Sequence, residues 1–126
     1  MEMIPGLVAD ADLSAKQFTA VKLSTTSGKV SAFASATDIP VGILDNKPDA
    51  DNRAASVVPA GNLTKARYGG TVTAGDLLMA ASDGELVKHT SGTDVTQWVI
   101  AQCIRSGVDQ DVQQVMVIGP YKGSAS

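Results

Sequence analysis

The chain has 126 residues, of which 44% are hydrophobic but only 4% aromatic, and its formal net charge is −3. This length fits one compact domain with a core of mainly Val, Ile, Leu and Ala side chains. The ten Lys and Arg residues are spread along the chain, which argues against nucleic acid as a partner because nucleic-acid-binding proteins gather basic residues into a patch.

The N-terminal residues are predicted to form an arm, residues 1–16, outside the main domain. The start lacks a basic region followed by a long apolar run, so we do not expect these residues to act as a secretory signal. The longest uninterrupted apolar run, residues 77–81, is too short to span a bilayer. An extended apolar segment can add a strand or fill a groove on a partner. The predicted partner-binding residues, on the same domain or on a neighbouring subunit, are Ile4, Pro5, Leu7 and Val8.

From residue 17 to 121 the sequence predicts a single, mainly β domain, either a small β-barrel or a β-sandwich. Short segments rich in β-branched residues recur between Gly, Pro, Asp, Asn and Ser residues. No long window keeps an apolar face at helical spacing. Residues 20–24 and 29–33 form the first predicted hairpin. Residues 122–126 are predicted to be a flexible tail.

The pattern of the first half returns in the second half. Residues 76–80 and 85–88 form a second predicted hairpin with Asp83 and Gly84 in its turn. The strands that follow also match, residues 39–44 with 98–103 and 57–61 with 115–119. The offsets between matched segments are 56, 59 and 58 residues, so we predict an internal duplication with copies at about 18–61 and 74–119.

Residues that carry catalysis are scarce. His89 is the only histidine and Cys103 the only cysteine, and neither lies in a serine-hydrolase or cysteine-protease motif. We expect His89 to be an exposed loop residue, Cys103 a small buried residue, and Trp98 a core residue, with a subunit interface as the alternative for Trp98. The chain is predicted not to be an enzyme. The less favoured alternative is a hydrolase or lyase accessory domain that uses Asp45 and Asp109 in equivalent loops.

The acidic loop at residues 45–52 is a stretch that is rich in oxygen ligands. If an EF-type loop starts at Asp49, Arg53 takes the fifth position, Ala54 replaces the glycine and Ala60 replaces the bidentate glutamate. The sequence therefore predicts no metal and no cofactor, while an irregular or subunit-shared ion site is left open.

Three runs of the sequence carry a resemblance to a known family. They are residues 21–23 (Val-Lys-Leu), 38–48 (Asp-Ile-Pro-Val-Gly-Ile-Leu-Asp-Asn-Lys-Pro) and 70–78 (Gly-Thr-Val-Thr-Ala-Gly-Asp-Leu-Leu). From about residue 18 to 119 the chain resembles a family of small phage proteins, long catalogued as a domain of unknown function and later associated with capsid cement or head decoration. Residues 98–103 are more polar than the family pattern, and the N-terminal segment has no counterpart in it.

This resemblance implies a structural virion protein. It implies a small β-barrel or β-sandwich that is made in the host cytoplasm and binds the outer surface of an assembled phage head. The implied partner is the major capsid protein. The implied oligomeric state is a homo-oligomer, with a trimer favoured. Such a module stabilises the shell without making or breaking a bond. The alternative within the virion is a β module of the tail or of a fibre attachment.

Overall fold

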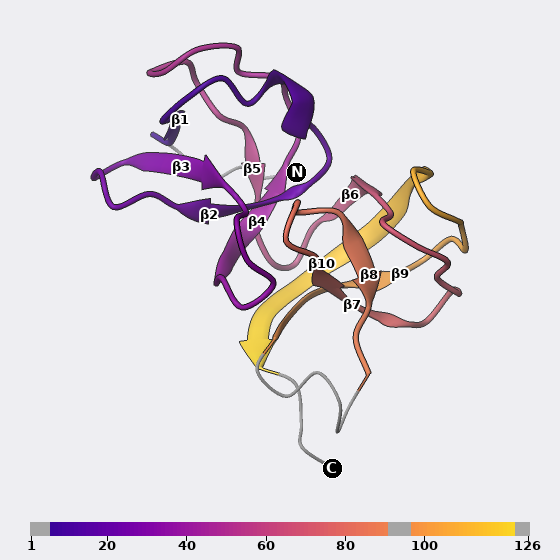
Figure 1. Cartoon of the computed structure of the whole chain (residues 1–126). Coiled ribbons are helices and arrows are strands. Elements are labelled where there is room, and N and C mark those ends of the chain that lie inside the picture. The colour runs from indigo at the N-terminus through magenta and orange to yellow at the C-terminus, as the bar shows by residue number, and fades with distance from the viewer. Residues whose placement is uncertain (1–5, 91–96, 123–126) are drawn as a thin grey trace.

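The computed structural model describes residues 6–90 and 97–122, with side chains to Pro120. Within these residues the chain forms ten β-strands and one short 3-10 helix, so the predicted mainly β fold is confirmed (Figure 1). No helix in this described part is long and apolar enough to cross a membrane. The predicted tail lies outside the described residues except for Lys122, the last residue of the final strand.

The strands form two five-stranded sheets, which divide the chain after the fifth strand. Unit 1 contains β1 (Val8–Ala9), helix η1 (Ser14–Lys16), β2 (Ala20–Leu23), β3 (Lys29–Ala32), β4 (Pro40–Leu44) and β5 (Val57–Val58). Unit 2 contains β6 (Leu63–Arg67), β7 (Leu77–Ala80), β8 (Leu86–Lys88), β9 (Trp98–Cys103) and β10 (Val112–Lys122). The strand orders are β1-β3-β2-β4-β5 and β6-β10-β9-β7-β8.

Both units repeat one connectivity. A hairpin, β2–β3 or β7–β8, pairs through its first strand with a third strand, β4 or β9, which pairs in turn with β5 or β10, always antiparallel. The register between the hairpin and the third strand shifts at corresponding points, where the pairing skips Val41 in β4 and Ile100 in β9. The predicted hairpins and the strands that follow them are therefore present in both halves.

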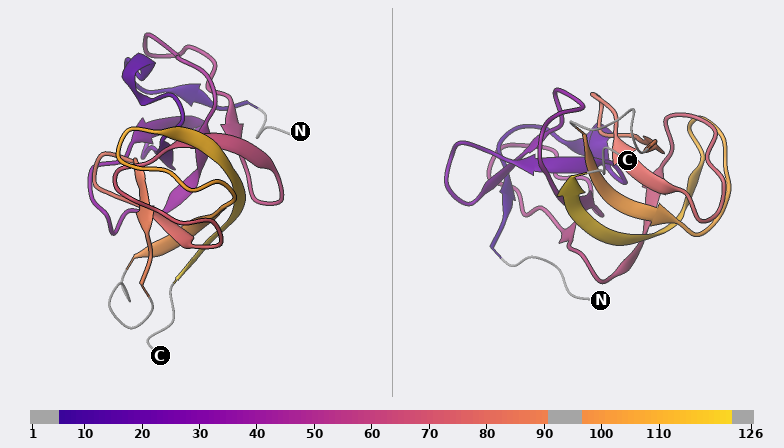
Figure 2. Two further views of the ribbon diagram at one scale, coloured as in Figure 1. Left: turned by 90° about the vertical axis from the view of Figure 1, so that its right-hand side faces the viewer. Right: turned by 90° about the horizontal axis from the view of Figure 1, so that it is seen from below.

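The correspondence between the units begins before each hairpin. Ala9 of β1 pairs in parallel with Val30 of β3, and Tyr68, directly after β6, makes a parallel bridge with Leu86 of β8. The bridge at Tyr68 joins the two edge strands of the unit 2 sheet at one end. Unit 2 is therefore a curled sheet whose edges meet there, as Figure 2 shows.

The loops that follow these pairings also match. The Leu13 N–H donates to the Pro48 carbonyl over 2.8 Å, and the Val72 N–H donates to the Gly107 carbonyl over 2.9 Å. Residues 7–16, which the sequence assigns to an arm, thus hold in unit 1 the place that the residues around Tyr68 and Val72 hold in unit 2. The duplication stays a prediction, which these hydrogen bonds support.

Each unit buries an inner face formed by residues at matching ladder positions. These residues are Val21, Val30, Leu44 and Val57 in unit 1, and Leu78, Leu86, Cys103 and Val115 in unit 2. Ala9 and Leu13 complete the core of unit 1, and Tyr68 and Val72 that of unit 2. The predicted burial of Cys103 is confirmed. Removal of these apolar side chains from water is the main stabilising term.

The face of unit 1 opposite its inner face packs on unit 2. Successive side chains of a strand point to opposite faces of the sheet, so Ala20, Ile43 and Val58 point away from the inner face of unit 1. They are buried in one cluster with the core of unit 2, and β4 packs against β9 and β10. The Ala20 N–H donates to the Gly84 carbonyl over 2.8 Å across the boundary. The outer face of unit 1 therefore completes the core of unit 2, while the inner face of unit 1 forms a separate core.

Candidate binding surfaces

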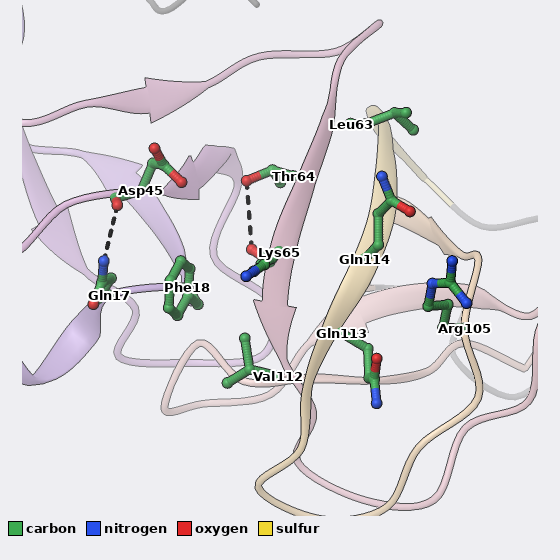
Figure 3. A pocket seen from close by; sticks show the side chains of 10 residues that line it. All are labelled: Gln17, Phe18, Asp45, Leu63, Thr64, Lys65, Arg105, Val112, Gln113 and Gln114. Carbon is green, nitrogen blue, oxygen red and sulfur yellow. Dashed lines mark hydrogen bonds between the residues drawn. The ribbon is translucent and has the colours of Figure 1, made fainter.

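A groove of about 780 Å³ runs along the edge strand β6. Figure 3 shows side chains of unit 1 facing β6 across this groove. The lining residues are Leu63, Thr64 and Lys65 on β6, Gln17, Phe18 and Asp45 on unit 1, and Arg105, Val112, Gln113 and Gln114 elsewhere on unit 2. No histidine, cysteine or serine is among these residues, so the lining supplies hydrogen-bonding groups and charge but no pairing of a nucleophile with a histidine base.

The backbone of β6 has an open edge in this groove. The hydrogen bonds of Asn62 and Tyr68 to β10 set the alternation of the ladder, so the N–H and C=O groups of Leu63 and Lys65 point away from β10. Among the described residues, these groups have no backbone partner, and the Lys65 carbonyl meets only the Thr64 hydroxyl at 3.5 Å. An unpaired edge of this kind can receive an additional strand.

Phe18 closes one end of the open edge. Its carbonyl accepts the Arg67 N–H over 2.8 Å, and its own N–H donates to the Leu44 carbonyl over 2.7 Å. Phe18 has a φ of 69°, a left-handed conformation that costs on the order of 1 kcal/mol or more in a residue with a side chain. The two hydrogen bonds offset this strain and leave Leu63 and Lys65 as the accessible part of the edge.

The side chains around the open edge favour an extended peptide with acidic groups. Lys65 and Arg105 are exposed cations, while Asp45 is the carboxylate of the lining. The Gln17 amide donates to the Asp45 carbonyl over 3.0 Å, which fixes the opposite wall. A strand that pairs with β6 would place alternate side chains beside Leu63 and Lys65. Apolar and acidic side chains match these neighbours.

A second hollow, of about 600 Å³, lies where the end of β2, the start of β4 and the loop before β4 meet Pro120 of β10. Its lining is largely apolar, with Lys22, Thr37 and Asp38 as the polar residues and Leu23, Ile39, Pro40, Val41 and Pro120 as the apolar ones. Leu23 is 60% exposed and Ile39 is 57% exposed. Large apolar side chains that are both exposed and adjacent are typical of a contact surface.

Asp38 holds the rim of this hollow in place. Its carboxylate accepts the N–H groups of Ala34 and Ser35, each at 3.0 Å, and the Lys22 ammonium at 3.1 Å. The hydrogen bond from Ala34 is the main cause that lowers the pKa of the Asp38 carboxyl below its ordinary 3.8, with further lowering by Lys22, while burial opposes the change. The rim charges are therefore paired with each other.

The predicted partner-binding residues of the N-terminal arm separate into two pairs. Ile4 and Pro5 lie outside the described residues. Leu7 packs against the core of unit 1, and Val8 pairs with Lys29 of β3. These two residues contact their own unit, and contact of the arm with a partner stays a prediction.

Two single residues differ from their predicted environments. His89 is only 5% exposed, and its N–H donates to the Leu77 carbonyl over 2.7 Å. The expectation of an exposed loop histidine is wrong because the chain keeps its pairing with β7 past the predicted strand end. Trp98 is half-buried at the start of β9 rather than in the core, because the core of unit 2 is filled further along that strand.

The structure does not bring the loop acids Asp45 and Asp109 together. The Asp45 backbone N–H donates to the Ser56 carbonyl over 2.7 Å. Asp109 accepts the Gln110 side-chain amide over 3.0 Å, and that amide also donates to Glu85 over 2.9 Å. The hydrogen bonds at the two positions thus go to different neighbours, and none among the described residues joins Asp45 to Asp109.

The acidic loop of unit 1 is held by basic residues. Asp51 pairs with Lys29 at 2.7 Å, and Asp49 with Arg53 at 3.6 Å. No group of three or more His, Cys, Asp or Glu residues in the described ranges is placed to hold a metal ion.

The open edge of β6 was not found from the sequence. Residues 63–67 read Leu-Thr-Lys-Ala-Arg, in which the buried positions are Thr64 and Ala66 and the exposed ones begin with Leu63. The apolar pattern therefore points to the wrong face. The available signal was Lys65, because a lysine in the middle of a short strand is common at sheet edges.

Comparison with known proteins identifies a related fold. No protein-family model and no curated protein matches the chain. Among solved structures, the N base of the head fibre protein gp8.5 of bacteriophage phi29 matches with a TM-score of 0.67 and 15% sequence identity, over 90% of this chain and 91% of that one. At this identity the match concerns the fold, and it extends over both units. The chain therefore shares its architecture with the base module of a phage head fibre.

Proposed function

We propose that this chain is a structural virion protein of a tailed phage that binds the outer surface of the head and stabilises the capsid. The observation that carries the proposal is the fold match to a head-fibre base over nine-tenths of the chain. It agrees with the family resemblance of residues 18–119. The fold match and the resemblance rest on different features of the chain, and both support a structural protein associated with the phage head.

The stabilising effect follows from mass action. A module that binds only the assembled, expanded shell lowers its free energy by RT ln(1 + [L]/Kd) at each site. Contact with several shell subunits at once increases the effect through avidity. The function needs no catalysis, and among the titratable side chains described above Asp38, Asp49 and Asp51 hold turns and loops together. The major capsid protein is the proposed partner.

The open edge of β6 is the proposed contact with the shell. Backbone groups of Leu63 and Lys65 would pair with an extended segment of the capsid protein, and the exposed cations Lys65 and Arg105 would favour acidic side chains in it. Pairing through the backbone gives affinity without a deep pocket, which suits an attachment repeated many times over a shell.

Cosedimentation with heads assembled from the cognate major capsid protein tests the proposal. We expect saturable binding to expanded heads and none to unexpanded shells. Loss of binding at both would refute the head assignment. Imaging of virions that carry a tagged copy separates the alternative, a module of the tail or of a fibre attachment, which the fibre-base fold also suits.

Lys65→Pro tests the contact. Proline removes an N–H that points away from β10, so the sheet keeps its own hydrogen bonds. The matched control is Lys88→Pro, at an exposed lysine on the opposite edge strand β8, where the bonds of Leu86 and His89 likewise place the N–H away from β7. We expect head binding to fall at least about tenfold for Lys65→Pro only. Equal binding by both variants would remove β6 from the contact.

A further inference from the structure

The two units contribute different faces to their contact, the outer face from unit 1 and the inner face from unit 2. Unit 1 contributes a row of residues, Ala20, Ile43 and Val58, which lie side by side on neighbouring strands. We call this row the plug. Unit 2 contributes the far end of its inner face, beyond Leu78 and Val115, and we call this end of a unit its mouth. The mouth residues of unit 2 are Ala80, Ile100, Ala101 and Val117, buried in one cluster with the plug.

The mouth of unit 1 is open. The ladder positions that match Ala80, Ile100 and Ala101 are Leu23, Val41 and Gly42. Leu23 and Val41 line the 600 Å³ hollow described above, and Leu23 is 60% exposed. Where unit 2 has a filled and buried mouth, the matching residues Leu23 and Val41 of unit 1 line a hollow, with Lys22 and Asp38 at its rim and Pro120 of unit 2 in its wall.

The plug of unit 2 is open as well. Its members are Leu77, Gln102 and Met116, which face one another across β7, β9 and β10 as Ala20, Ile43 and Val58 do in unit 1. Met116 is 41% exposed, and its neighbour Leu63 on β6 is 43% exposed. The row is apolar at both ends and carries an amide in the middle, where unit 1 has Ile43.

We infer that the open mouth of unit 1 receives the plug of unit 2 from a second copy of this chain. Within one chain, a plug already fills a mouth of the same design, and each chain then has one plug and one mouth left over. Such a contact is heterologous, so it closes into a ring if the rotation permits. The predicted homo-oligomer would be built in this way. The amide of Gln102 makes the row more compatible with water, so this contact should be weaker than the internal one.

Sedimentation velocity over a range of concentrations tests the contact with the full chain and without heads. Leu23→Arg places a charge in the mouth, and Met116→Arg places one in the plug. Both side chains are exposed, so neither change disturbs the core. Val108→Arg is the matched control, since Val108 is 54% exposed and lines neither surface. We expect the wild type to self-associate, the two variants to associate at least about tenfold more weakly, and the control to behave as the wild type.

A mixture of the two variants gives the sharper result. Leu23→Arg keeps an intact plug and Met116→Arg keeps an intact mouth, so the mixture should form a dimer with one chain of each kind and nothing larger. A wild type that stays monomeric, or variants that associate like the control, would overturn the inference. If the wild type is monomeric and the Leu23→Arg variant loses head binding, the inference is also overturned, and the mouth is then a contact with the capsid protein instead. The association results do not depend on the proposed function, whereas the head-binding result does.

Discussion

Units 1 and 2 share the order of four strands, β3-β2-β4-β5 and β8-β7-β9-β10, and the register shift, yet they fill their inner faces with different residues. At the matching position of the parallel pairing with the hairpin, unit 1 has Ala9, whereas unit 2 has Tyr68. Both are fully buried. The small residue suffices in unit 1 because Leu7, Leu13 and neighbouring residues of the N-terminal segment pack there. In unit 2 a single large side chain does most of this filling.

The outer faces of the two units differ in how far they are buried. Unit 1 buries its outer row against unit 2, and unit 2 leaves the matching row, with Met116 at its end, partly exposed. The same is true of the edges, because β6 keeps an open segment at Leu63 and Lys65. A repeated design thus leaves its last copy with unsatisfied surfaces. This difference is why we assign the binding surfaces of the protein mainly to unit 2 and to the mouth of unit 1.

The largest effect is expected from Tyr68→Ala. The variant removes a fully buried ring and leaves a cavity, which costs about 3–5 kcal/mol of unfolding free energy. Burial, together with Cys103 and Asp111, raises the pKa of Tyr68, so its hydroxyl stays protonated at neutral pH and donates to the Arg105 carbonyl at 2.7 Å. Urea unfolding measures the loss.

Tyr68→Phe is the control for volume. It keeps the ring and removes the hydroxyl, so we expect a loss of about 1 kcal/mol. A Cβ atom at Gly107 would lie 2.8 Å from the Tyr68 ring, so Gly107→Ala should destabilise the wild type and cost less when Tyr68 is alanine. Equal losses for the alanine and phenylalanine variants would show that the hydrogen bond, and not the filling of unit 2, is what matters.

Gly42→Ala compares the two third strands directly. A Cβ atom at Gly42 would lie 2.4 Å from the Val58 carbonyl oxygen, whereas the matching position of unit 2 is already Ala101. We expect Gly42→Ala to cost about 1–3 kcal/mol through crowding. Ala101→Gly, the reciprocal change, should cost only about 0.5–1 kcal/mol. Thermal unfolding measures both, and equal effects would show that β5 does not approach β4 more closely than β10 approaches β9.

The sequence predicted the repeated part of the fold because alternation and turn residues are local. The hairpins at Gly28 and Gly84 need a positive φ, which glycine adopts without a steric penalty. The N-terminal pairing escaped prediction because β1 is two residues long and obtains its hydrogen bonds from distant segments. Buried His89 escaped it as well, since a polar residue at a strand end is normally exposed. The open edge depends on which strand is missing beside β6, and the local sequence signals it only through Lys65.

The ion pair between Asp38 and Lys22 has no counterpart in the described part of unit 2, so Asp38→Asn tests a contact of unit 1 alone. The change weakens the hydrogen bonds from Ala34 and Ser35 and removes the ion pair with Lys22, and we expect a loss of about 1–2 kcal/mol at neutral pH. The folded pKa of Asp38 lies below its ordinary 3.8, so its contribution is present above pH 3.8 and is lost as the pH falls through the folded pKa. The difference between wild type and variant should therefore shrink on acidification, and a constant difference would contradict this assignment.

Glu85→Gln gives the smallest effect and has the opposite sign. Burial is the main cause that raises the pKa of Glu85, and the charges of Asp83 and Asp109 add to it, while the hydrogen bond from Gln110 opposes it. A raised folded pKa means that the contribution of Glu85 is present below its ordinary 4.5 and is lost as the pH rises through the folded value. Glutamine removes the charge and keeps an oxygen for Gln110, so we expect the variant to be more stable by about 0.3–1 kcal/mol at pH 7 and unchanged near pH 4. Urea unfolding at the two pH values measures this. A higher free energy of unfolding at both pH values would show that the effect comes from packing. The like charges at the β7–β8 turn would then not affect stability.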